Sequence, residues 1–177
     1  MIGFYYREII IKNIFHEGVK MKKKLIVYYS YTGNTEMIVD ILKDKLDVDI
    51  VRLETIKSYS GSYDDVVKQG KKETDSKYMP EIKEIGIDLK DYDEILLGSP
   101  VWWYTFASAV RTFLSKYDLS GKRIVPFITN GGWIGSTVDD IKSLANNSQV
   151  KNAINIKFNG SDMETSMNEI NAWIDRL

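Results

Sequence analysis

The stretch KLIVYYSYTGNT (residues 24–35) joins an unbroken apolar run to a cluster of small hydroxyl and amide side chains. An apolar run of this length is typical of a β-strand that is buried on both faces of a parallel sheet. The next apolar side chains, Ile38, Ile41, Leu42 and Leu46, recur at helical spacing. The stretch therefore predicts a strand, a polar turn and a helix, which is the repeating unit of an α/β fold.

The same alternation of strand and helix continues to the end of the chain. Strands are expected at residues 24–30, 48–54, 94–99, 123–129 and 152–158. Helical periodicity marks residues 38–46, 63–74, 106–117, 138–145 and 167–177. Ser161 and Glu164 have the spacing of a capping box for the last of these helices. The pattern predicts a doubly wound, five-stranded parallel sheet with helices on both faces, which binds ligands outside the carboxyl ends of its strands.

The composition is that of an ordinary globular protein and excludes several kinds of site. Of 177 residues, 44% are hydrophobic and 28% are charged, and the net charge is −1. A near-neutral chain offers no basic stripe, so we expect no nucleic-acid partner. No segment suggests a membrane span, so we also expect no membrane partner and a cytoplasmic location. The chain has no cysteine and one histidine, His16, so we assign neither a metal site nor catalytic residues.

The first twenty residues differ from the rest of the chain. Their apolar cluster is interrupted by Arg7, Glu8 and Lys12, and it lacks the features of a secretory signal. We interpret residues 1–20 either as the product of an upstream mis-start, with natural translation beginning at Met21, or as a short N-terminal extension that packs on the surface. Residues 21–177 then form one folded domain.

The turn after the first strand is a candidate phosphate site. It contains neutral side chains only: Ser30, Tyr31, Thr32, Gly33, Asn34 and Thr35. Neutral donors beside the first N–H groups of a helix suit a phosphate that is held statically. The turn lacks the lysine of a P-loop and the glycine spacing of a dinucleotide fold. An ordinary helix cap uses the same residue types, so it remains the alternative.

Two further turns, after the third and fourth strands, carry aromatic residues and glycines. Their candidate residues are Pro100, Val101, Trp102, Trp103 and Tyr104 in one turn, and Thr129, Asn130, Gly131, Gly132, Trp133 and Gly135 in the other. Aromatic side chains stack on flat ring systems, although one of the two adjacent tryptophans could instead fill the core. The three turns together predict a slot with a phosphate at one end and a flat aromatic group at the other.

These segments resemble the flavodoxin family. YSYTGNT (29–35) matches its phosphate-loop pattern Ser/Thr-x-Thr-Gly-x-Thr, and YDEILLGSPVWW (92–103) and FLSKYDLSGKRIVPFITNGG (113–132) are similar to a branch with a Pro-x-Trp-Trp loop. The resemblance implies a flavodoxin-like fold with noncovalently bound FMN. It implies that residues 30–35 bind the phosphate and that residues 100–104 and 129–135 flank the isoalloxazine ring. Trp102 is the expected stacking residue.

Three functions are compatible with such a fold. We expect an FMN-binding electron carrier, a monomer that exchanges electrons with redox partner proteins. The alternative is an NAD(P)H-dependent quinone or flavin reductase, which needs an open ring face. A phosphorylated receiver module would need acidic residues where the chain has Tyr29, Ser30 and Tyr31. Flavodoxins are commonly strongly acidic, whereas the net charge from Met21 onward is only −2, which predicts an uncharged docking surface.

Overall fold

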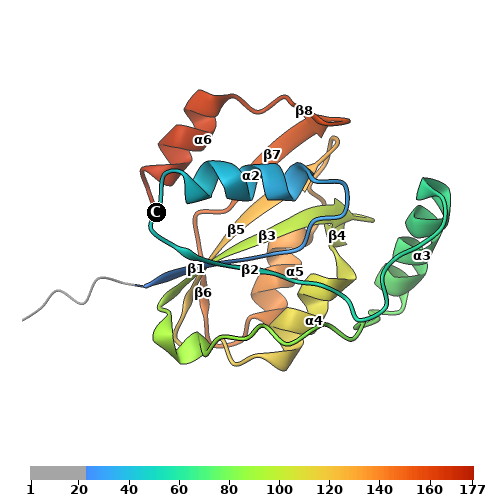
Figure 1. Cartoon of the computed structure of the whole chain (residues 1–177), viewed down its shortest axis with the longest axis horizontal. Coiled ribbons are helices and arrows are strands. Elements are labelled where there is room, and N and C mark those ends of the chain that lie inside the picture. Colours follow the sequence, from blue (N-terminus) through green and yellow to red (C-terminus); the bar gives the residue numbers. More distant parts are fainter. Residues whose placement is uncertain (1–22) are drawn as a thin grey trace, which may run out of the picture.

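The computed structural model describes residues 23–177 (Figure 1). The interpretation of residues 1–20, and of Met21 as the natural start, lies outside the described residues. Within residues 23–177, no helix is both long enough and apolar enough to cross a bilayer.

A mostly parallel sheet forms the centre of the fold. Its long strands are β1 (Lys24–Tyr28), β2 (Asp49–Arg52), β3 (Glu94–Trp102), β5 (Arg123–Asn130) and β7 (Ile154–Asn159). They lie in the order β2-β1-β3-β5-β7, and every neighbouring pair among them is parallel. The chain builds outward from β1 to β2 and then in the other direction from β3, so the switch point lies between β1 and β3.

The prediction of a doubly wound parallel sheet is confirmed, but the prediction of five strands is wrong, because the sheet has eight. The additional strands have two residues each: β4 (Thr105–Phe106), β6 (Gln149–Val150) and β8 (Asp162–Met163). β4 pairs antiparallel with β3, β8 pairs antiparallel with β7, and β6 pairs parallel with β5. Two residues are too few to show an alternating pattern, so these strands leave no periodic signal in the sequence.

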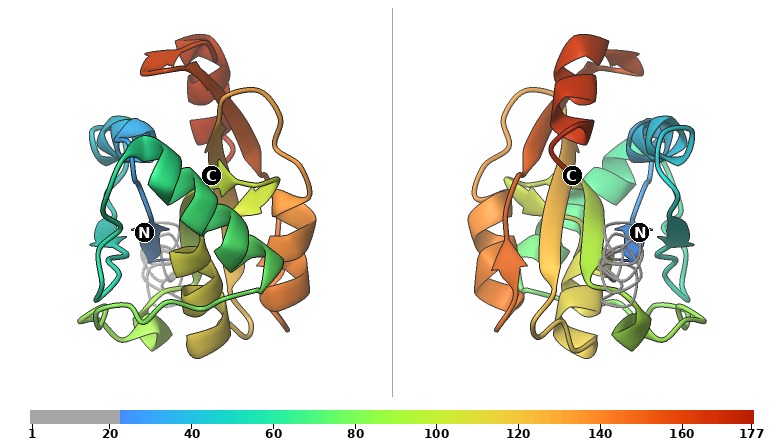
Figure 2. Two further views of the ribbon diagram at one scale, coloured as in Figure 1. Left: turned by 90° about the vertical axis from the view of Figure 1, so that its right-hand side faces the viewer. Right: turned by 90° about the vertical axis from the view of Figure 1, so that its left-hand side faces the viewer.

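Helices cover both faces of the sheet (Figures 1 and 2). They are α2 (Asn34–Lys43) and α6 (Met167–Ile174) on one face, and α4 (Ser108–Lys116) and α5 (Thr137–Leu144) on the other. Successive strand side chains point to opposite faces. Ile26 accordingly belongs to the core beneath α2 and α6, while Leu25 and Val27 belong to the core beneath α4 and α5.

The helix that follows β2 takes an unexpected place. α3 (Tyr63–Asp75) stands beyond the carboxyl ends of the strands (Figure 1). It begins at a complete capping box formed by Ser62 and Asp65, and it buries only Val66, Gly70 and Glu73. The chain then returns through the short helix η1 (Leu89–Asp91) to β3. α3 is therefore placed to form a wall of a ligand site.

The end of β3 and the cap of the last helix differ from the predictions. β3 was expected to end at residue 99, before Pro100, but it continues to Trp102 and turns back into β4. The capping box at Ser161 and Glu164 does not form, because these residues lie in and after the β7–β8 hairpin. α6 is capped instead by Ser166, whose Oγ accepts a hydrogen bond from the backbone N–H of Glu169.

Gly98 provides a test of the packing between β1, β3 and β5. A Cβ atom at this position would lie 2.2 Å from Cζ of Phe127 and 2.8 Å from Cβ of Tyr28. Gly98→Ala should therefore lower the free energy of unfolding of the apoprotein by about 1–3 kcal/mol, the usual cost of overpacking. Urea denaturation followed by circular dichroism measures this change.

Gly132→Ala is the matched control, because a Cβ atom there would meet nothing within 4 Å. Its free energy of unfolding should stay within about 0.5 kcal/mol of the wild-type value. Equal denaturation midpoints for Gly98→Ala and the wild type would contradict the close packing around Gly98.

Candidate functional site

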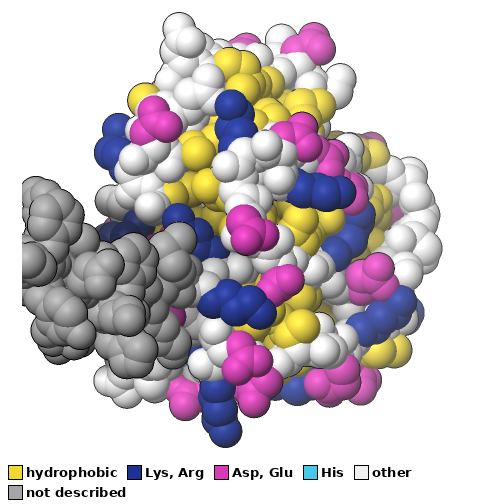
Figure 3. Space-filling view, turned by 60° about the vertical axis from the view of Figure 1, so that its left-hand side comes forward, with side chains coloured by type: hydrophobic (Ala, Val, Ile, Leu, Met, Phe, Trp, Pro, Cys, Tyr) yellow, Lys and Arg dark blue, Asp and Glu magenta, His cyan; other side chains and the backbone are white. Residues whose placement is uncertain are grey.

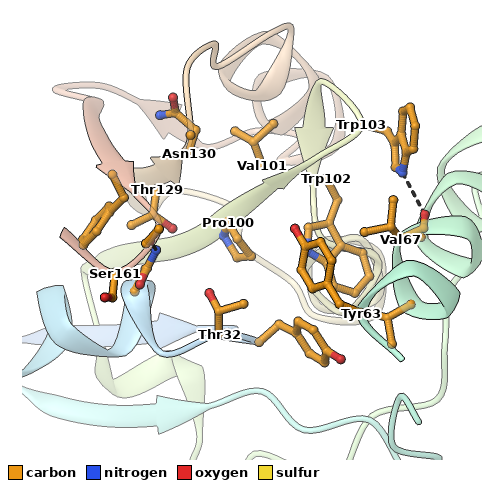
Figure 4. A pocket seen from close by; sticks show the side chains of 17 residues that line it. Thr32, Tyr63, Val67, Pro100, Val101, Trp102, Trp103, Thr129, Asn130 and Ser161 are labelled. Carbon is orange, nitrogen blue, oxygen red and sulfur yellow. Dashed lines mark hydrogen bonds between the residues drawn. The ribbon is translucent and has the colours of Figure 1, made fainter. Parts of the chain in front are cut away.

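A cavity of about 590 Å³ opens at the carboxyl ends of the strands (Figure 4). Five segments contribute to it: the turn after β1, the end of β3, the end of β5, the β7–β8 turn and one side of α3. Its lining consists of Tyr31, Thr32, Asn34, Tyr63, Val66, Val67, Gly70, Pro100, Val101, Trp102, Trp103, Thr129, Asn130, Gly131, Phe158, Gly160 and Ser161. The cavity lies at the switch point, where doubly wound sheets bind ligands.

The structure brings most of the predicted cofactor residues to this cavity. The ten that line it are Tyr31, Thr32, Asn34, Pro100, Val101, Trp102, Trp103, Thr129, Asn130 and Gly131. The seven outside the lining are Ser30, Gly33, Thr35, Tyr104, Gly132, Trp133 and Gly135. The binding role of each of these residues stays a prediction.

The turn after β1 leaves the start of α2 open to the cavity. The N-cap residue of α2 is Gly33, which has the left-handed conformation with φ 96°. Because glycine has no side chain, the N-cap position contributes no side-chain hydrogen bond to the helix. Ser30 Oγ accepts a hydrogen bond from the backbone N–H of Glu36 at 3.3 Å. The N–H groups that precede Glu36 in α2 thus remain as anion donors, and the Ser30 hydroxyl keeps its own hydrogen to donate.

Two side-chain hydrogen bonds tie this turn and the start of α2 to the β7–β8 turn and to the end of β5. Asn34 Nδ2 donates to the backbone oxygen of Gly160 at 2.8 Å. The hydroxyls of Thr35 and Thr129 lie 2.8 Å apart, and both side chains are buried. The polar end of the cavity is consequently built from three segments: the turn after β1, the end of β5 and the β7–β8 turn.

Arg52 holds the same turn from the edge of the sheet. Its Nη2 donates to the backbone oxygen of Ser30 at 3.3 Å, and its guanidinium forms an ion pair with Glu36. The guanidinium does not line the cavity. It therefore fixes the start of the turn, and the lining of the polar end itself consists of neutral groups.

Aromatic side chains form the opposite end of the cavity. Trp102 makes edge contacts with Tyr29, Tyr31 and Tyr59, with ring centroids 5.7, 6.2 and 5.0 Å apart. Its ring also packs against Gly70, where a Cβ atom would lie 3.2 Å from Cε3 of the indole. Trp102 thus belongs to the edge of the core and to the cavity wall at once, and its stacking on a bound ring stays a prediction.

Burial raises the pKa of the Tyr29 and Tyr59 hydroxyls well above the ordinary value. For Tyr59, the hydrogen bond that it donates to Oε2 of Glu73 at 2.7 Å raises the pKa further. Both phenols are accordingly neutral throughout the physiological pH range, and the aromatic wall carries no phenolate charge.

The two-residue turn between β3 and β4 is held in a rare conformation. Its residues, Trp103 and Tyr104, have φ of 47° and 68°. Trp103 Nε1 donates to the backbone oxygen of Val67 in α3 at 3.0 Å, as Figure 4 shows. The backbone oxygen of Tyr104 accepts from the N–H of Ser136 at 2.8 Å. Gly135 permits this approach, because a Cβ atom there would lie 2.1 Å from that oxygen.

The comparisons with known proteins assign the family. The family model described as Flavodoxin matches residues 23–177. The chain belongs to the flavodoxin family. No curated protein matches the sequence.

Solved structures show the same fold. A flavoprotein from Lactobacillus acidophilus NCFM, solved in complex with FMN, is 24% identical with a TM-score of 0.71 over 86% of this chain and 99% of that one. A protein from Bacteroides eggerthii DSM 20697, described as a flavoprotein, is 25% identical with a TM-score of 0.75 over 88% and 98%. The apo form of an NADH:FMN oxidoreductase, EMOB, is 13% identical with a TM-score of 0.52 over 88% of each chain. Membership of the flavodoxin family, together with the FMN complex of a relative, supports FMN binding.

The cavity of this flavodoxin-family chain fits FMN. Its volume is within the range of about 300–1,000 Å³ that is typical of small-ligand sites. The helix N-terminus, the Thr32 hydroxyl and the Ser161 hydroxyl offer neutral donors at one end, where a phosphate would be held. Trp102 and its tyrosine neighbours provide an apolar wall at the other end, where a flat ring would lie.

Seven lining residues were missed by the sequence-based reasoning. They are Tyr63, Val66, Val67 and Gly70 in α3, and Phe158, Gly160 and Ser161 at the end of β7. Periodicity identified the α3 helix but not its position over the site. The β7–β8 turn could have been found, because Gly160 and Ser161 follow the last long strand as the other three site turns follow theirs.

The Trp103–Val67 contact predicts how firmly α3 is held. Trp103→Phe removes the indole N–H and with it a hydrogen bond worth about 0.5–1.5 kcal/mol. Amide hydrogen exchange in residues 63–75 should become roughly 2- to 10-fold faster, since α3 buries few side chains elsewhere. Exchange of this segment can be followed by mass spectrometry on the apoprotein.

Trp133→Phe is the matched control, because the Trp133 side chain is 66% exposed and its ring lies beside that of Tyr104, with the centroids 5.1 Å apart. It should leave exchange in α3 unchanged. If Trp103→Phe also leaves it unchanged, the contact with Val67 does not restrain α3.

Proposed function

We propose that this protein is an FMN-binding electron carrier that passes electrons between redox partner proteins. One observation carries the proposal: a cavity at the switch point joins an uncharged anion site to an aromatic wall, and α3 covers it from the side. FMN supplies the electron-transfer chemistry when bound, and the protein contributes binding, orientation and the electrostatic surroundings.

Different residues provide the binding and the orientation of the cofactor. The turn at residues 31–34 and the start of α2 bind the phosphate with neutral donors. Trp102, fixed by its tyrosine neighbours and by Gly70, gives the ring a rigid apolar surface. Trp103 holds α3 against the cavity and limits the access of water to it.

The same arrangement favours a carrier over an NAD(P)H-dependent reductase. Hydride transfer from a nicotinamide needs a second flat ring to lie against the flavin. In this chain α3 lines the cavity with Val66, Val67 and Gly70. The hydrogen bond from Trp103 to the backbone oxygen of Val67 holds α3 in place. The NADH:FMN oxidoreductase is similar in fold alone, so it does not decide between the two functions.

Flavin titration and reduction test this proposal. Adding FMN to the apoprotein should quench flavin fluorescence and saturate at one equivalent. Under anaerobic conditions NADH and NADPH should leave the visible absorbance of the bound flavin unchanged over minutes, whereas dithionite should bleach it. Rapid bleaching by either nucleotide would identify the protein as a reductase, and failure to bind FMN would contradict both functions.

Exposed aromatic side chains surround the cavity and suggest how partners dock. Trp103, Tyr104, Trp133 and Tyr63 are between 40% and 67% exposed. Residues 99–110 and 129–138 contain no charged side chain. Away from the cavity, on the side of the molecule that Figure 3 brings forward, acidic and basic side chains are interspersed rather than separated. We therefore propose docking through this aromatic rim with little electrostatic steering.

The rate of electron transfer should accordingly depend weakly on ionic strength. With a basic cytochrome c as the acceptor, the second-order rate should change by a small factor between about 0.01 M and 0.15 M salt, where the Debye length falls from about 30 to 8 Å. Stopped-flow absorbance measures this rate. A decrease of tenfold or more, as strong steering produces, would contradict an uncharged docking surface.

A further inference from the structure

Tyr59 contacts every other ring of the aromatic cluster around Trp102. The centroid of its ring lies 5.0 Å from that of Trp102, 6.3 Å from that of Tyr31 and 6.4 Å from that of Tyr29, always in an edge-on arrangement. Tyr59 itself lies between β2 and α3, outside any helix or strand, and its neighbours in the chain are exposed. The local backbone therefore does little to fix the position of this ring.

A buried carboxylate in α3 holds the phenol instead. Glu73 is 6% exposed, and its Oε2 accepts a hydrogen bond from the hydroxyl of Tyr59 at 2.7 Å. Its Oε1 accepts from Nε2 of Gln69, one helical turn earlier, at 2.8 Å. A carboxylate has no hydrogen to donate, so the phenol is the donor. A hydrogen bond to a charged acceptor is stronger than one between neutral groups, which makes this contact a firm restraint on the ring.

The same helix also meets Trp102 directly. A Cβ atom at Gly70 would lie 3.2 Å from Cε3 of the indole. Trp102 lines the cavity, whereas neither Tyr59 nor Glu73 does. Glu73 can thus influence a ligand in the cavity only through the side chains that it holds, and the shortest route runs through Tyr59 to Trp102.

We infer that Glu73 is a positioning residue for the aromatic end of the cavity, because it fixes the Tyr59 phenol and Tyr59 in turn fixes the Trp102 indole. The inference rests on the proposed FMN-binding function, in which the flavin ring lies against Trp102. A wall that is already ordered loses less conformational freedom when a ligand binds. Glu73 should therefore strengthen the binding of FMN and of riboflavin by the same factor, since the two share the ring.

The indole N–H resonance of Trp102 tests the restraint in the apoprotein, without any flavin. In a proton–nitrogen correlation spectrum it is assigned by its absence from Trp102→Phe. It should shift or broaden in Tyr59→Phe, which lacks the donor, and in Glu73→Leu, which lacks the acceptor. Glu73→Gln keeps an acceptor oxygen and should leave it close to its wild-type position. Asp75→Asn is the matched control, because it removes an exposed carboxylate of the same helix that pairs with Lys71 at 2.8 Å.

Paired titrations with FMN and riboflavin measure the effect on binding. Tyr59→Phe and Glu73→Leu should each weaken both ligands by roughly 3- to 10-fold, a part of the effect of losing a hydrogen bond to a charged group. Glu73→Leu should have little further effect in the Tyr59→Phe background, because the two residues act through one contact. Glu73→Gln and Asp75→Asn should retain the wild-type affinities within a few-fold.

The possible results separate the alternatives. An indole resonance that stays unchanged in Tyr59→Phe and Glu73→Leu would overturn the inference. Losses of affinity that multiply in the double variant would also overturn it, since Glu73 would then act independently of Tyr59. A wild-type protein that binds neither flavin would overturn the proposed function, while the indole resonance would still decide whether Glu73 positions Trp102. Urea denaturation of each apoprotein checks folding, and Tyr59→Phe decides the result if Glu73→Leu does not fold.

Discussion

The parallel pairing of β1 with β3 is the contact on which the rest of the molecule depends. Because the chain turns in opposite directions across the sheet after these strands, α2 leaves β1 towards one face and α4 follows β3 on the other. The space above the two strand ends is then filled by neither helix. β3 also extends further than β1. Tyr28, the last residue of β1, pairs with Gly98, and β3 continues to Trp102. The longer strand carries its aromatic residues past the sheet edge and into the cavity wall.

The turn at Trp103 and Tyr104 shows what this extension requires. A two-residue hairpin loop favours positive φ at both positions, which is why asparagine and glycine usually occupy them. Bulky residues in that conformation cost on the order of 1–3 kcal/mol each. Hydrogen bonds from Trp103 to Val67 and from Ser136 to Tyr104 hold the turn, and Gly135 leaves room for the second. The glycine-rich third turn therefore lines the cavity with Thr129, Asn130 and Gly131 and supports the second turn through Gly135 and Ser136.

Sequence patterns predicted the long strands, the order of elements and the site turns because buried apolar runs and polar turn residues are local features. They did not locate α3, since periodicity records that one helix face is buried but not which surface buries it. The last helix shows the same limit at a smaller scale. Ser161–Glu164 and Ser166–Glu169 have identical spacing, and only the pairing of β8 with β7 decides that the second pair starts α6. The pairing of strands that are far apart in the sequence also decides that Ser161 lies in the cavity lining.

The acidic side chain nearest to the aromatic wall is buried within α3 and its neighbours, not displayed on the rim of the cavity. Glu73 is 6% exposed, and its two oxygens accept hydrogen bonds from Tyr59 and Gln69. Among the described residues no lysine or arginine forms an ion pair with it. Gly70, one turn earlier on the same helix, lines the cavity, and Tyr59 packs against Trp102. A carboxylate held by neutral donors in a low-dielectric setting acts over a longer range than a surface charge. A buried acidic side chain therefore stands one helical turn from the cavity wall, while residues 99–110 and 129–138 around the cavity contain no charged side chain.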